Sequence, residues 1–560
     1  MCLSKKHYYK TYLHTLLIKK KIIMSKKRIK NIAIVIGSLI GIIAIAGGYF
    51  YSIIPKPAGP VPALQSELFE PPKNQAPPAG KFIYKSATEL AALIKNKQAT
   101  SVEIVKDIIA YIKYHNHKYN AIVWLLEDQA LKDAVKADSL LAHDSIMGPL
   151  HGVPITVKEQ FSVRGSYLTL NAKMIGGFKP ASDQAVVNQL KKSGAIIIGT
   201  TNVPHMLMDY QTQGEIYPTA SNPYDTSRTP GGSTGGGAAS LAAGFVPLEL
   251  GGDMGGSIRV PSSFCGLYGL KTTELAIEIW DQEFPGMEFD TKNAALAVGG
   301  PLARNPADLE LMWNVLKETP NQLLKSMPYE YDTIKSLNEY NIAWYDALKF
   351  GEFQIPVHHD IKIKLSVFLD SLTLHGVKKE NTMPNTFSEQ FQIFMGLMAY
   401  MNTYGQPWII RKFIVDGFKK MGAGPIDLSK AYDLAMSQDK NKHKEFITQR
   451  KIIIAEWEKF FMKYDFLICP VMPMPAIKKC PMGSAIDIDG IETNYWVSGS
   501  YALMVNALGL PSITIPLGLN DEGLPIGVQV VGKYFSEPQL IHFAKLLESI
   551  TPGFIKPKEL

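Results

Sequence analysis

The chain has few cysteines and few charged residues for its length. Only Cys2, Cys265, Cys469 and Cys480 stand among 560 residues, too few and too scattered for a disulfide framework or a zinc cluster. Charged residues make up 19% and apolar residues 46%, which excludes a disordered or fibrous chain. The length allows two to four domains, or one large enzyme with a tail.

Acidic residues are absent from residues 1–31, which carry ten Lys or Arg. Removing these ten charges from the net charge of +7 leaves −3 for residues 32–560. Because the body of the chain is near neutral, the basic total charge gives no argument for nucleic-acid binding.

Charged residues are also absent from the 23 residues between Ile32 and Ile54. As a helix rising about 1.5 Å per residue, this stretch would measure about 34 Å, enough to cross a bilayer core of about 30 Å. The positive-inside rule then predicts a basic cytoplasmic tail (1–31), a transmembrane anchor (32–54) and a catalytic domain on the non-cytoplasmic side. Ala44-Ile45-Ala46 leaves open a cleaved signal peptide, and hence a secreted or periplasmic protein.

Two further features complete the N-terminal part. Met24, followed by Ser-Lys-Lys-Arg, is a second candidate start of translation. Residues 55–80 carry eight prolines, which is typical of an extended linker. We therefore expect the folded catalytic domain to occupy residues 81–560.

Short apolar segments alternate with amphipathic ones through much of this domain. Ser86-x-x-Glu89 and Thr100-x-x-Glu103 each fit a capping box before a helix. Further helices are expected at residues 127–142, 183–193, 234–244, 497–508 and 536–549, and strands at 121–125, 154–157, 195–199, 246–250, 512–516 and 526–531. The alternation predicts an α/β fold around a largely central sheet. Residues 275–480 are less regular, with longer helices, and the chain shows no repeat with a solenoid period.

Two glycine-rich turns that contain serine carry the strongest chemical signal, around Ser233 and around Ser257. Consecutive N–H groups in such a turn form an anion-binding nest. The Gly255-Gly256-Ser257 turn would thus place a hydroxyl beside its own oxyanion donors, as acyl transfer requires. Upstream, Lys158 ends an otherwise apolar strand, where a lysine must be buried, paired or functional.

Other interpretations of these turns are weaker. Gly231-x-Ser233-x-Gly235 has the spacing of a nucleophile elbow, but a loop precedes it instead of the strand that an elbow needs. Neither turn has the Gly-Lys-Ser/Thr of a phosphate loop. A third interpretation is that the glycine turns are purely structural. The presence of two such turns together with Lys158 makes this interpretation less favoured.

The twelve histidines give no serine–histidine site. His115 with His117, and His358 with His359, are too close together for a sensible ligand geometry without cysteine or acidic partners, and are interpreted as surface residues. His151 is a candidate for shaping the pocket. The sequence indicates no metal and no organic cofactor.

These motifs resemble the amidase signature family. The resemblance covers roughly residues 82–550 and is densest from 148 to 272. The segments that carry it are Val157-Lys158, Gly199–Asn202, Gly231–Gly236, Gly251–Arg259, Cys265–Lys271, Gly299–Arg304 and Gly509–Pro516. It implies an amidase-signature α/β fold, with a central mixed sheet covered by helices. It also implies a triad in which Ser257 is the nucleophile, Ser233, after a cis peptide bond, the bridging serine, and Lys158 the base.

The resemblance implies supporting roles as well. Thr234 would assist the proton relay, whereas Asp253 and Arg259 are expected to be scaffolding. The oxyanion hole would consist of four backbone N–H groups: those of Met254, Gly255, Gly256 and Ser257. Three positions outside the triad depart from the residues commoner in the family: Glu159, Thr200 and Thr272.

We therefore expect a membrane-tethered serine amidase that hydrolyses a carboxylic amide through an acyl-enzyme. A lipid amide is one substrate hypothesis, because the family includes fatty acid amide hydrolases with an N-terminal membrane segment. The expected partners are a small-molecule amide and the membrane but no nucleic acid, and a homo-oligomer is left open. The alternatives are a glutaminase like the A subunit of glutamyl-tRNA amidotransferase, and a catalytically silent, membrane-tethered binding protein.

Overall fold

The computed structural model describes residues 59–65, 69, 76–78, 80–281, 296–319, 335–421 and 426–558. The predicted basic tail and the predicted anchor at 32–54 lie outside these residues, as does much of the proline-rich linker. Among the helices that are described, none combines the length and the apolar character needed to cross a membrane.

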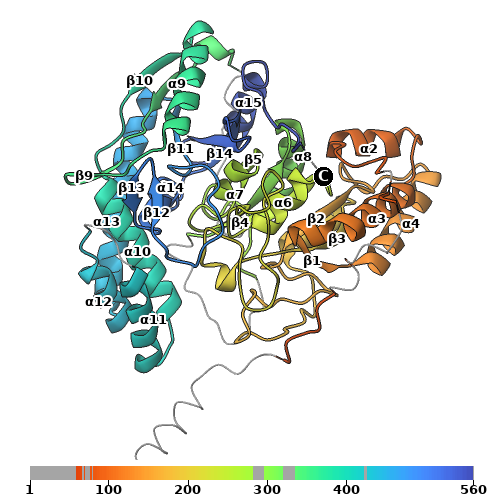
Figure 1. Ribbon diagram of the computed structural model, residues 1–560, viewed down its shortest axis with the longest axis horizontal. Helices are drawn as coiled ribbons and strands as arrows, with labels where there is room; N and C mark the ends of the chain where they lie inside the picture. Colours follow the sequence, from red (N-terminus) through yellow and green to blue (C-terminus); the bar gives the residue numbers. More distant parts are fainter. Residues whose placement is uncertain are drawn as a thin grey trace, which may run out of the picture. The chain divides into compact units, whose positions relative to one another are not determined.

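An 11-stranded mixed sheet runs through the described part of the chain (Figure 1). From one edge to the other its strands are β1 (Ile122–Leu125), β3 (Ile196–Thr201), β2 (Pro154–Lys158), β4 (Leu248–Asp253), β6 (Val298–Ala303), β5 (Tyr268–Lys271), β14 (Ser512–Leu519), β15 (Pro525–Val531), β11 (Phe466–Pro470), β7 (Asn341–Trp344) and β10 (Lys378–Asn381). Strands β3, β2 and β4 are parallel, as are β11, β7 and β10, while the other neighbours pair antiparallel. The predicted central mixed sheet is confirmed.

Two short hairpins lie apart from this sheet. They are β8 (Lys349–Phe350) with β9 (Phe353–Gln354), and β12 (Ile486–Ile488) with β13 (Ile491–Thr493). In the part of the chain that the structure describes, single turns of 3₁₀-helix include η2 (His205–Leu207), η3 (Leu337–Glu339) and η4 (Val497–Gly499).

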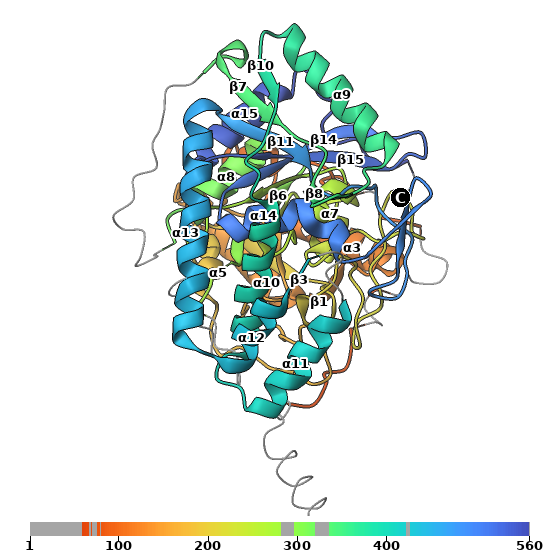
Figure 2. The same cartoon turned by 90° about the vertical axis from the view of Figure 1, so that its left-hand side faces the viewer.

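The helices flank the sheet along its whole width. In chain order they are α2 (Ala87–Lys95), α3 (Ser101–Tyr119), α4 (Glu127–Ala142), α5 (Ala185–Lys192), α6 (Gly235–Ala242), α7 (Arg259–Phe264), α8 (Pro306–Leu316), α9 (His359–Leu374), α10 (Phe387–Thr403), α11 (Trp408–Met421), α12 (Ser429–Ser437), α13 (Lys440–Lys463), α14 (Ser500–Leu508) and α15 (Glu537–Leu547). Helices α10 to α13 gather on one side, away from α2, α3 and α4 (Figure 1), and this side faces the viewer in Figure 2.

Strand β11 shows how the sheet divides the core. Phe466 and Ile468 belong to a hydrophobic cluster with α8 and α15, whereas Leu467 and Cys469 belong to another with α10, α13 and α14. Successive side chains of a strand point to opposite faces. Both faces of the sheet are therefore covered by helices, as the sequence predicts.

Local sequence signals account for the first two helices. The Ser86 hydroxyl accepts from the N–H of Glu89 at 3.0 Å, and the Ser86 N–H donates to the Glu89 carboxylate at 2.7 Å. Thr100 and Glu103 form the same reciprocal pair, at 3.1 and 2.9 Å. Both predicted capping boxes are confirmed, and each satisfies N–H groups that the helix itself leaves unpaired.

Replacing Thr100 with alanine is expected to lower the free energy of unfolding by about 1 kcal/mol, because the first turn of α3 loses its side-chain acceptor. Urea denaturation at fixed pH measures this change. The Thr100→Ser variant keeps a hydroxyl acceptor and should retain most of the stability. Equal losses in the two variants would show that the cap is not the cause.

Candidate active site

Lys158 lies at the carboxyl end of β2, in the interior of the molecule. Strand β2 runs parallel to β3 on one side and β4 on the other, and all five of its residues are buried. A strand buried on both faces is typically a continuous apolar run, as Pro154-Ile-Thr-Val largely is. The Lys158 side chain is 1% exposed, so its amine is removed from bulk water.

The Lys158 amine joins the two serine-containing turns. Its Nζ donates to Ser233 Oγ at 2.8 Å and to the carbonyl oxygen of Gly252 at 2.9 Å. Burial lowers the pKa of Lys158 to about 7, although the carboxylates of Asp253 and Glu249 act to raise it. A substantial fraction of the amine is therefore neutral at neutral pH.

Ser233 belongs to a tight turn ahead of α6, and the Gly232–Ser233 peptide bond is cis. A Cβ on Gly232 would lie 2.4 Å from the carbonyl oxygen of Asp209, so the neighbouring backbone leaves room only for glycine. The Ser233 side chain is 1% exposed. The structure thus brings together Lys158 and Ser233, two residues that the sequence assigned to the triad.

Ser257 lies on the second turn, immediately before α7. Its carbonyl oxygen accepts the N–H of Thr234 at 3.1 Å, which fixes the two turns to each other. Thr234 also donates its hydroxyl to the carbonyl oxygen of Gly252 at 3.3 Å, the oxygen that Lys158 contacts. Unlike Ser233 and Lys158, Ser257 is partly exposed, so a substrate can approach it.

Asp253 shapes the turn that carries Ser257. Its carboxylate accepts the N–H groups of Gly256 at 2.9 Å and Ile258 at 3.1 Å, and contacts Arg259 Nε and Nη2 at 3.0 Å each. Burial acts to raise the pKa of Asp253, but the charge and hydrogen bonds of Arg259 outweigh it and hold that pKa well below the usual range.

Arg259 extends this network to the C-terminal part of the chain. Its Nη1 donates to the Ala502 carbonyl oxygen at 3.0 Å and to Gln529 Oε1 at 2.7 Å. Asn506 Nδ2 donates to Asp253 Oδ1 at 2.9 Å. Helix α14 and strand β15 thereby hold the turn in place, an arrangement consistent with the predicted scaffolding role.

One acidic residue near Lys158 was not singled out from the sequence. Glu249, in β4, is fully buried and accepts the Thr201 hydroxyl at 2.6 Å. Burial raises the pKa of Glu249 to about 8, although the charge of Lys158 acts to lower it. An acid inside the apolar run Val246–Leu250 is the signal that could have pointed to it.

Glu159, noted in the sequence only as a departure from the family, is also buried. Its carboxylate accepts the hydroxyl groups of Thr169 and Tyr217 at 2.8 Å each and the N–H of Leu170 at 3.0 Å. Burial raises the pKa of Glu159 to about 7. The residue after Lys158 thus anchors the loop that follows β2.

The histidines differ in part from the interpretation made from sequence. His115 is buried, and its ring lies 4.2 Å from that of Tyr111, so its assignment to the surface is wrong. His151 is buried too; its Nδ1 accepts the N–H of Met147 at 3.2 Å, and its Nε2 lies 3.1 Å from the carbonyl oxygen of Ala137. These contacts tie α4 to the loop before β2.

A family profile described as Amidase matches residues 103–541. The chain belongs to the amidase family. It is therefore a hydrolase of the amidase type, acting on carbon–nitrogen bonds, and the hypothesis of a catalytically silent binding protein loses its support.

Curated relatives match almost end to end. The A subunit of glutamyl-tRNA(Gln) amidotransferase from Heliobacterium modesticaldum is 29% identical over 86% of this chain and 99% of the relative. The protein of the same name from Alkaliphilus metalliredigens is 30% identical, over 81% of this chain and 93% of the relative.

Solved structures share the fold. A bacterial aryl acylamidase of the amidase signature family superposes with a TM-score of 0.68 at 22% identity, covering 84% of this chain and 97% of that one. A fatty acid amide hydrolase gives a TM-score of 0.67 at 22% identity, covering 85% of this chain and 86% of that one. The predicted amidase-signature fold is confirmed.

The predicted location needs correction. An apolar run with flanking Lys and Arg led us to place the catalytic domain outside the cytoplasm, anchored by residues 32–54 or secreted. The curated relatives are named as components of a tRNA amidotransferase, which contradicts that location. The prediction rested only on the apolar run and its flanking charges, residues 32–54 are not among those described, and the membrane tether has no support.

Replacing Asp253 with asparagine should lower the free energy of unfolding by about 3–5 kcal/mol, because the Arg259 charge stays buried without its partner. Thermal and urea unfolding measure the loss. The exposed Lys412–Asp416 pair supplies the control, since Asp416→Asn should leave stability unchanged within error. Similar behaviour of the two variants would contradict the role given to Asp253.

Proposed function

We propose that the protein hydrolyses a carboxylic amide through an acyl-enzyme on Ser257, with Ser233 relaying a proton to Lys158. The observation that carries the proposal is the buried 2.8 Å contact between Lys158 Nζ and Ser233 Oγ. A lysine acts as a base only when its amine is neutral, and burial brings the pKa of Lys158 to about 7.

The hydrogen bonds of Lys158 suit this role. The carbonyl oxygen of Gly252 takes one N–H of the amine at 2.9 Å, which orients the nitrogen. A neutral amine then keeps a lone pair that can accept the proton of the Ser233 hydroxyl at the same 2.8 Å separation. Thr234, bound to the same Gly252 oxygen, helps to fix the geometry of the relay.

The reaction then follows in two halves. Ser257 Oγ attacks the amide carbon while its proton passes to Ser233 Oγ, and the Ser233 proton passes to Lys158 Nζ. The same route returns a proton to the departing nitrogen, so that the amine leaves and the acyl group remains on Ser257. Water attacks the ester in the second half, which releases the acid and restores the Ser257 hydroxyl.

Backbone N–H groups beside Ser257 would stabilise the negative oxygen of the intermediate. Of the four that the family resemblance implies, the N–H of Gly256 donates to Asp253 Oδ1. Those of Met254, Gly255 and Ser257 are the better candidates. Gly256, at φ +111°, gives the turn the curvature that aims successive N–H groups inward.

Apolar side chains border the same turn. A Cβ on Gly255 would lie 3.0 Å from Leu503 and 3.7 Å from Phe394, and Met254 packs against the cluster built from α10, α13 and α14. An acyl group bound at Ser257 would contact these side chains, which favours an apolar acyl chain. This supports the lipid-amide hypothesis.

The curated relatives favour a second candidate, a glutaminase that acts within an amidotransferase complex. Their names describe the A subunit of an enzyme for glutamyl-tRNA(Gln), and one of them matches over 99% of its length. The chemistry at Ser257 would be the same, with glutamine as the amide and ammonia as the leaving group. Nucleic acid would then contact the complex, contrary to the expectation from charge.

Variants of Ser257 and Lys158 test whether these two side chains carry out the reaction. We expect Ser257→Ala to abolish nearly all amide turnover, and Lys158→Ala to lower kcat/KM by about 10²–10⁴-fold at pH 7. The loss in Lys158→Ala should shrink as pH rises, because hydroxide then replaces the missing base. Steady-state kinetics on a soluble amide measure both variants, and full activity in either one would contradict the proposal.

The pH profile tests the state of the lysine. Because the base is the neutral amine, kcat/KM should rise with pH through about 7 and level off above it. Lys271→Met is the matched control: Lys271 is as deeply buried, burial lowers its pKa to about 7 too, and its Nζ donates to the Leu510 carbonyl oxygen at 2.8 Å. In this variant the midpoint of the kcat/KM profile should stay near pH 7. A shifted midpoint would show that the profile follows Lys271 and not Lys158.

A panel of amides decides between the two substrates. Acyl amides of graded chain length, together with glutamine, are assayed with the native protein and with Ser257→Ala as the blank. The lipid-amide hypothesis expects kcat/KM to rise with chain length, and it fails if long chains react no faster than short ones. Ammonia release from glutamine, absent in Ser257→Ala, would favour the glutaminase.

A further inference from the structure

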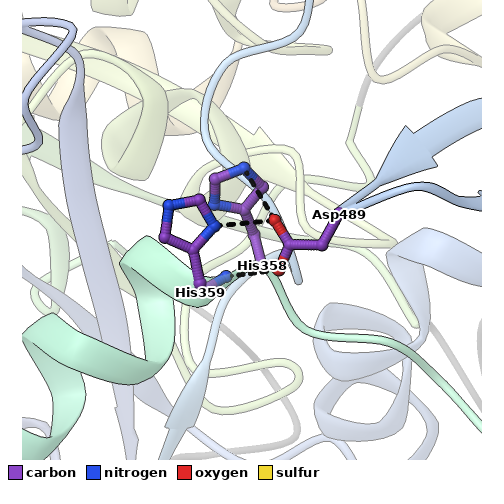
Figure 3. A group of neighbouring side chains, drawn as sticks. All are labelled: His358, His359 and Asp489. Carbon is purple, nitrogen blue, oxygen red and sulfur yellow. Dashed lines mark hydrogen bonds and ion pairs between the residues drawn. The ribbon is translucent and has the colours of Figure 1, made fainter.

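Three side chains with metal-ligating atoms converge outside the candidate active site (Figure 3). His358 and His359 stand at the start of α9, and Asp489 occupies the turn of the β12–β13 hairpin. Asp489 Oδ1 lies 2.7 Å from His359 Nδ1 and 3.3 Å from His358 Nε2. No acidic partner for this histidine pair was assigned from the sequence, whereas the fold supplies one from 130 residues further along the chain.

The backbone and the rings hold this group together. Asp489 Oδ2 accepts the backbone N–H of His359 at 2.7 Å, so the carboxylate is fixed against the start of α9. The two imidazole rings stack with their centroids 4.3 Å apart. The side chains of His359 and Asp489 are 62% and 34% exposed, which leaves the group open to ions from solvent.

We propose that His358, His359 and Asp489 bind a divalent transition-metal ion, with Zn²⁺ as the best match. Two imidazole nitrogens and a carboxylate oxygen are a common zinc ligand set, in which water fills the fourth position. Ligand atoms of a tetrahedral zinc site lie roughly 3.3 Å apart, given bonds of about 2.0–2.2 Å. The donor atoms here all lie within 4.8 Å of one another, so small side-chain rotations bring them to that spacing.

The carboxylate of Asp360 lies beside both histidine rings. Its Oδ2 lies 3.5 Å from His358 Nδ1 and its Oδ1 lies 3.3 Å from His359 Nε2, while Asn520 Nδ2 donates to Oδ2 at 2.8 Å. In the structure His358 Nδ1 also accepts the backbone N–H of Asp360 at 3.3 Å. A hydrogen bond from Nδ1 to the Asp360 carboxylate would instead leave His358 Nε2 free for the metal, as carboxylates commonly do for zinc-bound histidines.

Metal binding here would join α9 to the β12–β13 hairpin. Ile486 and Ile488 of that hairpin pack in one cluster with Val260 and Phe264 of α7, the helix that directly follows Ser257. The ion would thus stabilise the packing around the turn that carries Ser257, without taking part in the reaction.

Zinc titration of the full-length, metal-free protein tests the site. Isothermal titration calorimetry gives the stoichiometry, and Co²⁺ absorption reports on the ligands independently of stability. We compare Asp489→Asn, which keeps an acceptor for the His359 N–H but loses the charge, with His359→Ala. His375→Ala is the matched control, because His375 caps the other end of the same helix and its Nδ1 lies 2.8 Å from the Ser371 carbonyl oxygen.

We expect the native protein and His375→Ala to bind one Zn²⁺ per chain with equal affinity. In Asp489→Asn and His359→Ala, binding should be absent or at least about tenfold weaker. Zinc should also raise the unfolding temperature of the native protein and of His375→Ala but not of the two ligand variants. Absence of saturable binding, or equal binding in Asp489→Asn and the native protein, would overturn the proposal. Folding of each variant is checked by its unfolding temperature without metal.

Discussion

A single buried amine organises the active region of this protein. Lys158 Nζ, out of contact with bulk water, touches the hydroxyl of one glycine-rich turn and the carbonyl oxygen of the strand that leads to the other. An ammonium ion is costly to bury, so the same burial that excludes water brings the amine toward its neutral form. The chemistry of the site follows from its location at the end of β2.

The rest of the architecture keeps the two turns facing that amine. Parallel pairing of β2 and β4 brings Gly252 beside Lys158, and the Asp253–Arg259 pair connects the second turn to α14 and β15. Residues that are more than two hundred positions apart in sequence thereby determine one turn. A large part of the fold is therefore needed to position the few side chains of the site.

Elements with a clear local pattern were easier to predict from the sequence than elements without one. Helix α4 begins and ends where the prediction placed it, and strands β1 to β4 were expected within a few residues, because apolar runs and capping residues act locally. Strands β5, β6, β7, β10 and β11 were not predicted. Short segments such as Val298–Ala303 form strands because they pair with neighbouring strands. No local pattern in the sequence reveals that pairing.

The same contrast holds for functional residues. Family motifs pointed to Lys158, Ser233 and Ser257, and the structure brings the first two into contact while their catalytic roles stay a proposal. Glu249 is marked in the sequence only as an acid inside an apolar run, and the partnership of His359 with Asp489 depends on a long-range contact; neither was predicted. The membrane location, inferred from an apolar run and its flanking charges, was wrong.

The most direct test of the central claim is the rate at which a fluorophosphonate labels the native protein as a function of pH. Covalent labelling requires the nucleophile and its base but no leaving amine, and mass spectrometry identifies the modified residue. We predict labelling at Ser257, with a rate that rises through a midpoint near pH 7 and a far lower rate in Lys158→Ala. Labelling at another residue, or a rate in Lys158→Ala equal to that of the native protein, would contradict the claim.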